Sequence, residues 1–176
     1  MTMRALCALL LAVHASAWAQ NNPVDPARVL DTFDQLAAWQ AGASDGVRAS
    51  IQKASGPEGP ALRLDFDLAG TAGYALAALA LSLDLPANYE ITFDLRADAR
   101  VNHFQVKLVD ASGENVWWFN RPNYEFPREW QRISIKKRQI DFAWGPTKER
   151  TLTHAARLEF VVAGLDPAIH PLRMNY

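Results

Sequence analysis

Residues 103–120, HFQVKLVDASGENVWWFN, contain two strand-like segments joined by a turn. In the first segment, Phe104, Val106 and Leu108 alternate with polar residues. A period of two is typical of a half-buried β-strand, because successive side chains point to opposite faces. Residues 110–113, Asp-Ala-Ser-Gly, match a type I turn followed by a left-handed glycine. The stretch therefore predicts an antiparallel β-hairpin.

The same alternation recurs on both sides of this hairpin, with Gly- and Pro-rich turns between the segments. The further alternating segments are 61–68, 89–98, 131–137 and 156–164. Residues 73–85 are Ala-rich and could be helical, but their leucines at every second position favour a strand. Residues 30–42 are also ambiguous and could form a strand followed by one helical turn. We predict one all-β domain, an antiparallel β-sandwich of the jelly-roll type.

The N-terminus has the features of an export signal. Arg4 precedes the apolar run Ala5–Val13, and Ala17-Trp18-Ala19 forms an A-x-A cleavage site. The run is too short to span a bilayer. We expect residues 1–19 to be a signal peptide cleaved after Ala19, residues 20–28 to be a linker, and the protein to be secreted or periplasmic.

Composition narrows the function classes. The formal net charge is −1, which gives no global basic field for nucleic acid. The only cysteine, Cys7, lies in the predicted signal peptide, so the processed chain has no disulfide and no thiol nucleophile. No nucleophile, zinc-protease or nucleotide-binding motif occurs, and three histidines remain after processing, widely scattered. We therefore expect a protein that is not an enzyme, with no nucleic acid partner and no membrane span.

The parity of the 103–120 hairpin decides which tryptophan faces outward. A G1-bulge turn closed by Asp110 and Glu114 would bury Trp118 and place Trp117 on the polar face. A two-residue loop would reverse this parity and put Trp118 outside, and Gly113 favours the first register. On the polar face Trp117 would lie beside His103, Gln105 and Lys107.

An exposed tryptophan with polar neighbours suits a sugar. The C–H face of a pyranose stacks on an indole, and its hydroxyls need fixed donors and acceptors. Arg121 and Tyr124, in the loop that follows, are candidate rim residues, and Trp144 lies on another loop. The alternative is that Trp117 packs under the 120–128 loop and that Trp144 only anchors its own loop.

Several segments together resemble the galactose-binding-like jelly rolls. These are residues 29–41, 73–98, 102–120 and 129–146. The chain is most similar to the N-terminal module of secreted bacterial discoidin or coagulation-factor type C domain proteins, which are related to carbohydrate-binding modules. The resemblance covers about residues 29–164. It implies a sandwich that is often appended to a catalytic region and sometimes holds a structural calcium.

The end of the chain departs from the pattern of this family. The family continues with a last strand that carries acidic residues, whereas residues 165–176 read LDPAIHPLRMNY. Pro167 and Pro171 cannot donate hydrogen bonds in a central strand. We expect a missing last strand or a truncated product. This removes the expected source of calcium ligands and leaves Asp31 and Asp34 as weak candidates.

Two function classes follow from these observations. The first is an exported, non-catalytic carbohydrate-binding module that recognises a polysaccharide or oligosaccharide, needs no cofactor, and is a fragment of a larger sugar-processing protein. The second is a protein-interaction or structural sandwich in which the same face docks another domain or subunit. A groove with an exposed tryptophan and converging polar groups would favour the first, and a wide, flat apolar patch would favour the second.

Overall fold

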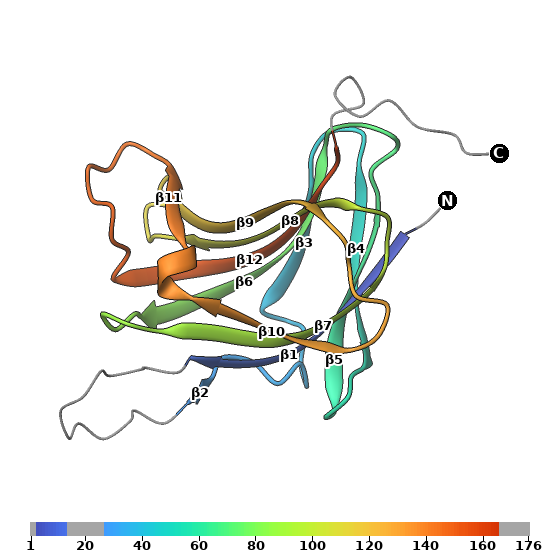
Figure 1. Cartoon of the computed structure of the whole chain (residues 1–176), viewed down its shortest axis with the longest axis horizontal. Helices are drawn as coiled ribbons and strands as arrows, with labels where there is room; N and C mark the ends of the chain where they lie inside the picture. The colour runs from blue at the N-terminus through green and yellow to red at the C-terminus, as the bar shows by residue number, and fades with distance from the viewer. Residues whose placement is uncertain (1–2, 14–26, 166–176) are drawn as a thin grey trace.

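The computed structural model describes residues 3–13 and 27–165, which form two stacked β-sheets (Figure 1). One six-stranded sheet, sheet A, has the order β10-β7-β1-β5-β4, with β2 pairing with β1. The other six-stranded sheet, sheet B, has the order β11-β9-β8-β12-β6-β3. The strands are β1 (Met3–Val13), β2 (Arg28–Val29), β3 (Trp39–Ala43), β4 (Arg48–Ser55), β5 (Pro60–Asp67), β6 (Tyr74–Asp84), β7 (Glu90–Asp98), β8 (Asn102–Val109), β9 (Val116–Tyr124), β10 (Gln131–Lys136), β11 (Asp141–Trp144) and β12 (His154–Ala163).

The alternation in the sequence correctly predicts which side chains form the core. Along β8, Phe104, Val106 and Leu108 are buried and the residues between them are not. β5 shows the same alternation from Leu62 to Asp67, whereas β12, an inner strand of sheet B, is buried at every position from Leu158 to Val162. The aromatic centre joins the two sheets, since the Phe93 ring of β7 lies 5.0 Å from that of Phe160 on β12. Burial of this continuous apolar layer between the sheets is the main stabilising term of such a fold.

Two ambiguous segments are now assigned. Residues 73–85 contain strand β6, as the leucine spacing predicts. In residues 30–42 the strand comes last and not first, because a turn precedes β3, and the expected helical turn is wrong. Phe33 in this segment is fully buried and its ring lies 5.5 Å from that of Trp39. The aromatic contact holds the segment in an irregular path onto the core. The one helix among the described residues is the 3₁₀ turn η1 (Lys137–Gln139).

The N-terminal segment occupies an unexpected place. Met3–Val13, within the predicted signal peptide, forms strand β1 between β5 and β7. The cleavage site at residues 17–19 and the tail 166–176 lie outside the described residues. Signal-peptide cleavage stays a prediction. Of the predicted linker 20–28, Ala27 and Arg28 are described, and Arg28 begins β2.

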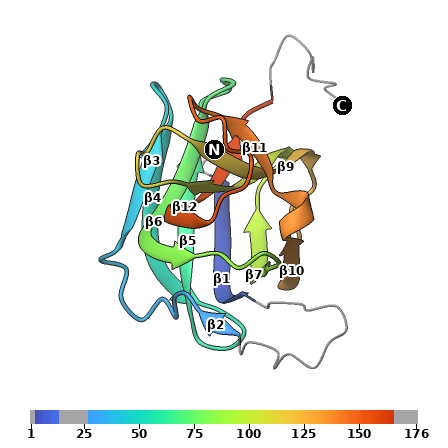
Figure 2. The ribbon, with the colours of Figure 1, turned by 90° about the vertical axis from the view of Figure 1, so that its left-hand side faces the viewer.

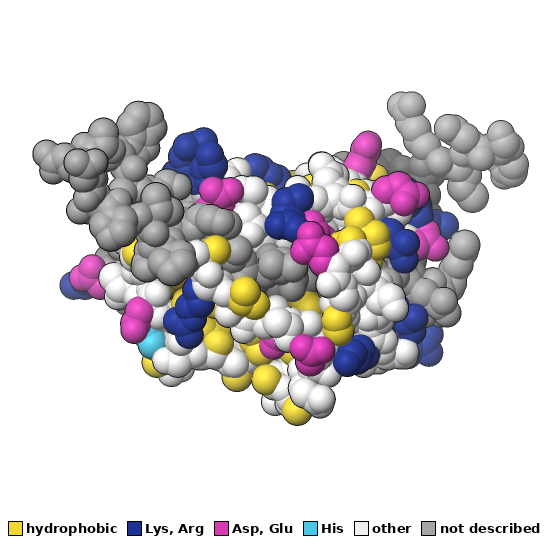
Figure 3. Space-filling model, turned by 90° about the horizontal axis from the view of Figure 1, so that it is seen from below, with side chains coloured by type: hydrophobic (Ala, Val, Ile, Leu, Met, Phe, Trp, Pro, Cys, Tyr) yellow, Lys and Arg dark blue, Asp and Glu magenta, His cyan; other side chains and the backbone are white. Residues whose placement is uncertain are grey.

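The outer side of sheet A carries mixed charge. Figure 3 shows basic and acidic side chains interspersed over this face. On β7, Asp94 is buried and accepts two hydrogen bonds from Arg132 of β10, at 2.6 and 3.0 Å. Pairing of this kind leaves no single-sign patch on the described part of the face.

Candidate functional site

The pairing of β8 with β9 turns the opposite set of β9 side chains outward from the set that we predicted. Lys107 lies opposite Trp118, and Leu108 lies opposite Trp117. Trp117 is 4% exposed and belongs to the core, whereas Trp118 is half-buried on the Lys107 side. The expectation that Trp117 forms an outward platform is therefore wrong, and the alternative parity, with Trp118 outside, is correct.

The error comes from the length of the hairpin loop. Gly113 has φ +78° and its N–H donates to the carbonyl of Asp110 at 3.1 Å, as a type I turn followed by a left-handed glycine requires. The closing pair, however, is Asp110 with Asn115, joined by a hydrogen bond of 3.2 Å from Asp110 N–H to the Asn115 carbonyl. The Asn115 amide also donates to the Asp110 carboxylate at 2.6 Å. These bonds draw one more residue into the loop, which turns every side chain of β9 over.

Trp117 anchors the loop that precedes β12. Its indole N–H donates to the carbonyl of Arg150 at 2.9 Å. Its ring meets that of Phe142 edge-on at 5.3 Å, and the Arg150 guanidinium lies 4.2 Å from the Phe142 ring centroid. Trp117 thus holds β11 and the following loop against the sandwich.

Aromatic rings converge over Lys107 on the outer face of sheet B. Lys107 Nζ lies 5.0 Å from the centroid of Trp144 and 5.8 Å from that of Tyr74. Trp144 belongs to β11 and Tyr74 to β6, and one strand separates each of these from β8. Neighbouring strands are about 4.8 Å apart, so these rings lean inward from both sides. Figure 1 shows sheet B strongly curved between its edges β11 and β3.

We call this surface the Lys107 face. Its outward side chains come from β6, β8, β9, β11 and β12. Trp144 is 46% exposed and Tyr74 is 41% exposed, so both rings are open to solvent. The residues of the face are Tyr74, His103, Gln105, Lys107, Trp118, Asn120, Trp144 and Glu159.

A bulge aims Trp144 at this face. The pairing of β11 with β9 shifts between Phe142 and Trp144, so Trp144 lies opposite Val116 on the outer side. The Trp144 and Trp118 rings then meet edge-on at 5.4 Å. Gly145 follows with φ +132°, and a Cβ there would lie 2.4 Å from Asn115 Oδ1. Asn115 Oδ1 also accepts the Thr147 N–H at 2.9 Å, so one buried amide ties the β8–β9 turn to the segment after Trp144.

The charge at the centre of the face is partly buried. Burial lowers the pKa of Lys107, while nearby Glu159 opposes this shift. Glu159 is 8% exposed and accepts a hydrogen bond from Arg157 at 2.6 Å. An ammonium between two rings loses part of its hydration shell. Cation–π attraction to the rings offsets part of the free-energy cost of that loss. A ligand with hydroxyl oxygens would supply further acceptors to it.

Amide groups lie beside the aromatic cluster. Gln105 and Asn120 are opposite each other on β8 and β9. The Asn120 side-chain oxygen is buried and has no hydrogen-bond partner among the described residues. A buried acceptor without a donor is costly, which points to a donor from water or from a ligand. His103, half-buried at the end of the same row, lies opposite Ala163.

The structure brings four of the seven predicted binding residues together and separates three. His103, Gln105, Lys107 and Trp144 share the Lys107 face. Tyr124 packs on the core, with its ring 5.3 Å from that of Phe104.

Arg121 also lies away from this face. Its guanidinium is 4.5 Å from the ring of Phe119, a buried residue of the inner face. With Trp117, then, Arg121 and Tyr124 lie apart from the face. Trp118, Tyr74 and Asn120 were missed because they depend on the hairpin parity and on the pairing of β6, which local patterns do not give.

The two calcium candidates are used in local hydrogen bonds. Asp31 accepts the Phe33 N–H at 2.5 Å and the Trp39 indole N–H at 3.3 Å. Asp34 accepts the Thr32 hydroxyl at 2.8 Å. No group of three or more His, Cys, Asp or Glu that could hold a metal occurs among the described residues. The described residues around Asp31 and Asp34 do not fit the ligand set that calcium needs.

Comparisons with known proteins bear on the fold. No protein-family model matches the chain, and no curated protein matches it. Among solved structures, the chain is similar to the family 11 carbohydrate-binding module of the cellulosomal cellulase Lic26A-Cel5E of Clostridium thermocellum, with a TM-score of 0.62 and 21% identity over 77% of this chain and 84% of that one.

A second structure is a family 11 module from Clostridium thermocellum in complex with a β-1,3-1,4-mixed-linked tetrasaccharide, with a TM-score of 0.62 and 20% identity over 78% of this chain and 86% of that one. These neighbours confirm the predicted jelly-roll sandwich. In the described part of the chain, no helix has the length and apolar character needed to cross a bilayer.

Proposed function

We propose that this protein is a non-catalytic carbohydrate-binding module whose ligand lies on the Lys107 face. The observation that carries this proposal is the placement of Tyr74 and Trp144, two exposed rings, on either side of Lys107. Exposed rings on rigid strands offer flat apolar surfaces without an ordering cost. The C–H faces of successive sugar units would stack on them.

The polar groups between the rings suit hydroxyl recognition. Lys107 donates only, the amides of Gln105 and Asn120 both donate and accept, and the Asn120 oxygen lacks a donor in the described part of the chain. A sugar hydroxyl can accept a hydrogen bond from Lys107, and the Gln105 amide can both donate to and accept from sugar hydroxyls. This mixture favours a neutral oligosaccharide. Mixed-linked β-glucan is the first ligand to test, since the fold neighbour in complex holds a β-1,3-1,4-mixed-linked tetrasaccharide.

The carboxylates named below, all in the described part of the chain, are paired with arginines, which favours a binding function over a catalytic one. Asp65 and Asp67, on one strand, are each paired with an arginine, Arg63 at 2.9 Å and Arg48 at 2.7 Å. On the Lys107 face, Glu159 is engaged by Arg157. A glycosidase would need two carboxylates that face each other across a ligand. We further propose that the module is exported, to the periplasm or outside the cell, and acts beside a catalytic domain.

A titration of the protein with polysaccharides tests this proposal. The parent should bind at least one β-glucan in affinity electrophoresis, and Trp144→Ala should lose most of that binding. Trp130→Ala is the matched control, because Trp130 is a half-buried tryptophan that lies against Arg96 of sheet A, at 5.1 Å. Equal retardation of both variants would refute the assignment of this face.

The docking alternative is less well supported by the surface. A protein interface would need a broad apolar patch. The exposed large hydrophobic residues of the described chain are few, namely Val29, Tyr74, Val101 and Trp144. Two of these, Tyr74 and Trp144, are aromatic and flank a charged side chain, which suits a sugar better than a protein.

A further inference from the structure

A second concave surface lies at the opposite edge of sheet B from Trp144. β3 is the edge strand of sheet B and β4 is an edge strand of sheet A. The two strands are consecutive in the chain and lie next to each other along one side of the sandwich (Figure 2). A groove of about 600 Å³ is lined by residues 41–43 of β3, residues 47–50 at the start of β4 and residues 65–67 at the end of β5. We call it the β3–β4 groove.

Small side chains keep this groove open. β3 contributes Ala41, Gly42 and Ala43 to the lining, and β4 contributes Ala49. Ala41 and Ala43 are exposed, although they fall on the same side of β3 as the buried Trp39. Larger side chains here would close the edge of the sandwich, since protein interiors are filled at close packing. The apolar surface that remains can contact the C–H groups of a ligand.

A tight turn joins the two strands at one end of the groove. The Val47 N–H donates to the Ser44 carbonyl at 3.1 Å, and Gly46 between them has φ +78°. The Ser44 hydroxyl accepts the Tyr74 N–H of β6 at 2.9 Å, and the Ser44 N–H donates to the Tyr74 carbonyl at 3.0 Å. The backbone therefore sets the spacing of β3 and β4, and a ligand would meet a groove that is already formed.

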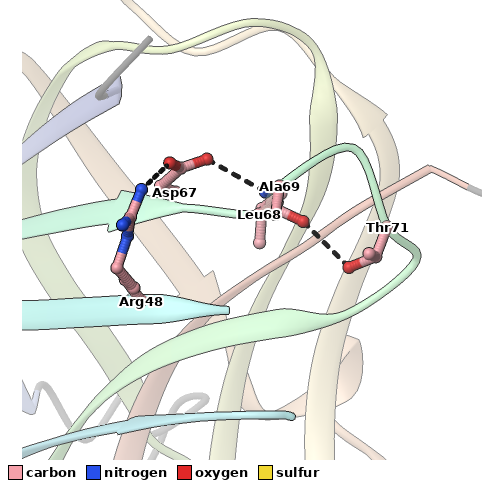
Figure 4. A network of polar contacts seen from close by, with 5 residues as sticks. All are labelled: Arg48, Asp67, Leu68, Ala69 and Thr71. Carbon is pink, nitrogen blue, oxygen red and sulfur yellow. Dashed lines mark hydrogen bonds and ion pairs between the residues drawn. The ribbon is translucent and has the colours of Figure 1, made fainter. Parts of the chain in front are cut away.

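An ion pair forms the polar part of the lining. Arg48 of β4 donates to the Asp67 carboxylate of β5 at 2.7 Å, and the Ala69 N–H donates to the other carboxylate oxygen at 2.9 Å (Figure 4). The same figure shows the next turn, in which the Thr71 hydroxyl donates to the Leu68 carbonyl at 2.8 Å. The bonds to Asp67, first that from Arg48 and then that from Ala69, lower the pKa of this carboxyl group. Asp67 is therefore a charged acceptor near neutral pH.

This ion pair keeps hydrogen-bonding capacity for a ligand. The Arg48 side chain is 84% exposed, so most of its N–H donors are open to solvent. A carboxylate has about four acceptor sites, and the bonds from Arg48 and Ala69 use only part of them at Asp67. Ser50, also in the lining, adds a hydroxyl that can both donate and accept. Donors and acceptors thus lie side by side.

The charges of the lining favour a neutral ligand. Asp65 and Asp67 are both acidic, against the single positive charge of Arg48, which disfavours an anion. Asp65 is in turn paired with Arg63 at 2.9 Å, so both carboxylates have an arginine and a cationic ligand would gain little. Neighbouring hydroxyls of a sugar ring match an arginine–carboxylate pair, because one can accept from the guanidinium while the next donates to the carboxylate.

We propose that the β3–β4 groove is a second carbohydrate site, which holds a short sugar segment by its hydroxyl edge. Its volume lies within the range of small-molecule sites, about 300–1,000 Å³. The choice of a sugar rests on the proposed function, whereas the place and the lining of the groove do not. With the Lys107 face as the first site, one module would hold two stretches of glycan, which raises the apparent affinity for a polysaccharide without tighter contacts.

Titration of the ¹⁵N-labelled protein with two glucose disaccharides, one β-1,3-linked and one β-1,4-linked, tests this inference. The backbone N–H signals of Gly42, Ala49 and Ser50 should shift and saturate with at least one of them. In Trp144→Ala these shifts should persist, which separates the groove from the Lys107 face. Groove shifts with the Trp118 and Trp144 indole signals unmoved would still support the second site, while contradicting the proposed function of the Lys107 face.

A substitution in the polar lining tests the role of Arg48. Arg48→Met should weaken binding in the groove by about tenfold or more, because it removes charged hydrogen bonds. Arg128→Met is the matched control, since Arg128 is also exposed and is paired with Asp98 of β7, and it should leave binding unchanged. Equal effects of the two variants would overturn the inference.

Two further outcomes would overturn it without any variant. In the first, the groove signals stay in place while the Trp144 indole signal shifts and saturates, which leaves the Lys107 face as the sugar site without a second one. In the second, sulfate moves the groove signals and neither disaccharide does, which means that Arg48 serves an anion.

Discussion

Trp117 and Trp118 are consecutive residues of β9 that lie on opposite faces of sheet B. Trp117 is 4% exposed and donates its indole N–H to the Arg150 carbonyl at 2.9 Å. Trp118 lies opposite Lys107 and meets the exposed Trp144 ring edge-on at 5.4 Å. One residue therefore holds the fold together and its neighbour lines the proposed binding face.

Truncating these two residues should have opposite effects. Trp117→Ala leaves a cavity and an unpaired carbonyl, and should lower the free energy of unfolding by about 3–5 kcal/mol. Trp118→Ala should cost about 1 kcal/mol or less, as expected for a partly exposed site, but should weaken glucan binding. Urea denaturation and affinity electrophoresis measure the two quantities. A well-folded Trp117→Ala with lost binding would reverse the assignment.

Gly145 should control binding through Trp144. Gly145→Ala places a Cβ against Asn115 in a backbone conformation that L residues rarely adopt, at a cost of about 1–3 kcal/mol. The strain should shift Trp144, so binding should fall while the fold survives. Gly113→Ala is the matched control, because Gly113 also has positive φ but nothing lies within 4 Å of its Cβ position. If both variants bind glucan equally, the bulge does not position Trp144.

The charge of Lys107 should lower the stability of the fold and strengthen glucan binding. Burial lowers its pKa, so the charged form is disfavoured in the folded state. The unfolded chain therefore binds more protons between the lowered pKa and about 10.4, and stability should rise with pH in that window. Lys107→Met should raise the melting temperature at pH 7, remove this rise and weaken glucan binding. A lower melting temperature would show that cation–π contacts outweigh the cost of burial.

Tyr89 should limit stability at high pH. It is 5% exposed, and burial raises its pKa to about 12. In the unfolded chain tyrosine ionises near about 10, so the unfolded state loses its proton first and stability should fall between about pH 10 and 12. Tyr89→Phe should flatten this fall in urea titrations at pH 9 to 11.5. An unchanged slope would mean that other groups cause the alkaline loss.

The layered fold was predictable because its signal is local. The alternation of Phe104, Val106 and Leu108 depends only on the period of a strand, and the structure confirms these residues as core. The position of Gly113 was equally readable, because a left-handed turn residue is nearly always glycine.

The binding face was less predictable because it depends on register. Asn115 bonds to the Asp110 carboxylate and to Thr147, 32 residues away, and so lengthens the loop by one residue. That long-range bond exchanged the roles of Trp117 and Trp118. Tyr74 reaches Lys107 from a strand that only the sheet order places nearby.

Tryptophan indole resonances would test the central claim most directly. In a ¹H–¹⁵N spectrum of the protein titrated with a mixed-linked β-glucan oligosaccharide, we predict shifts of the Trp118 and Trp144 indole N–H signals. The signals of Trp117, which is bonded to Arg150, and of Trp130 on sheet A should stay in place. Shifts confined to Trp130, or none with any glucan that the protein binds, would contradict binding on the Lys107 face.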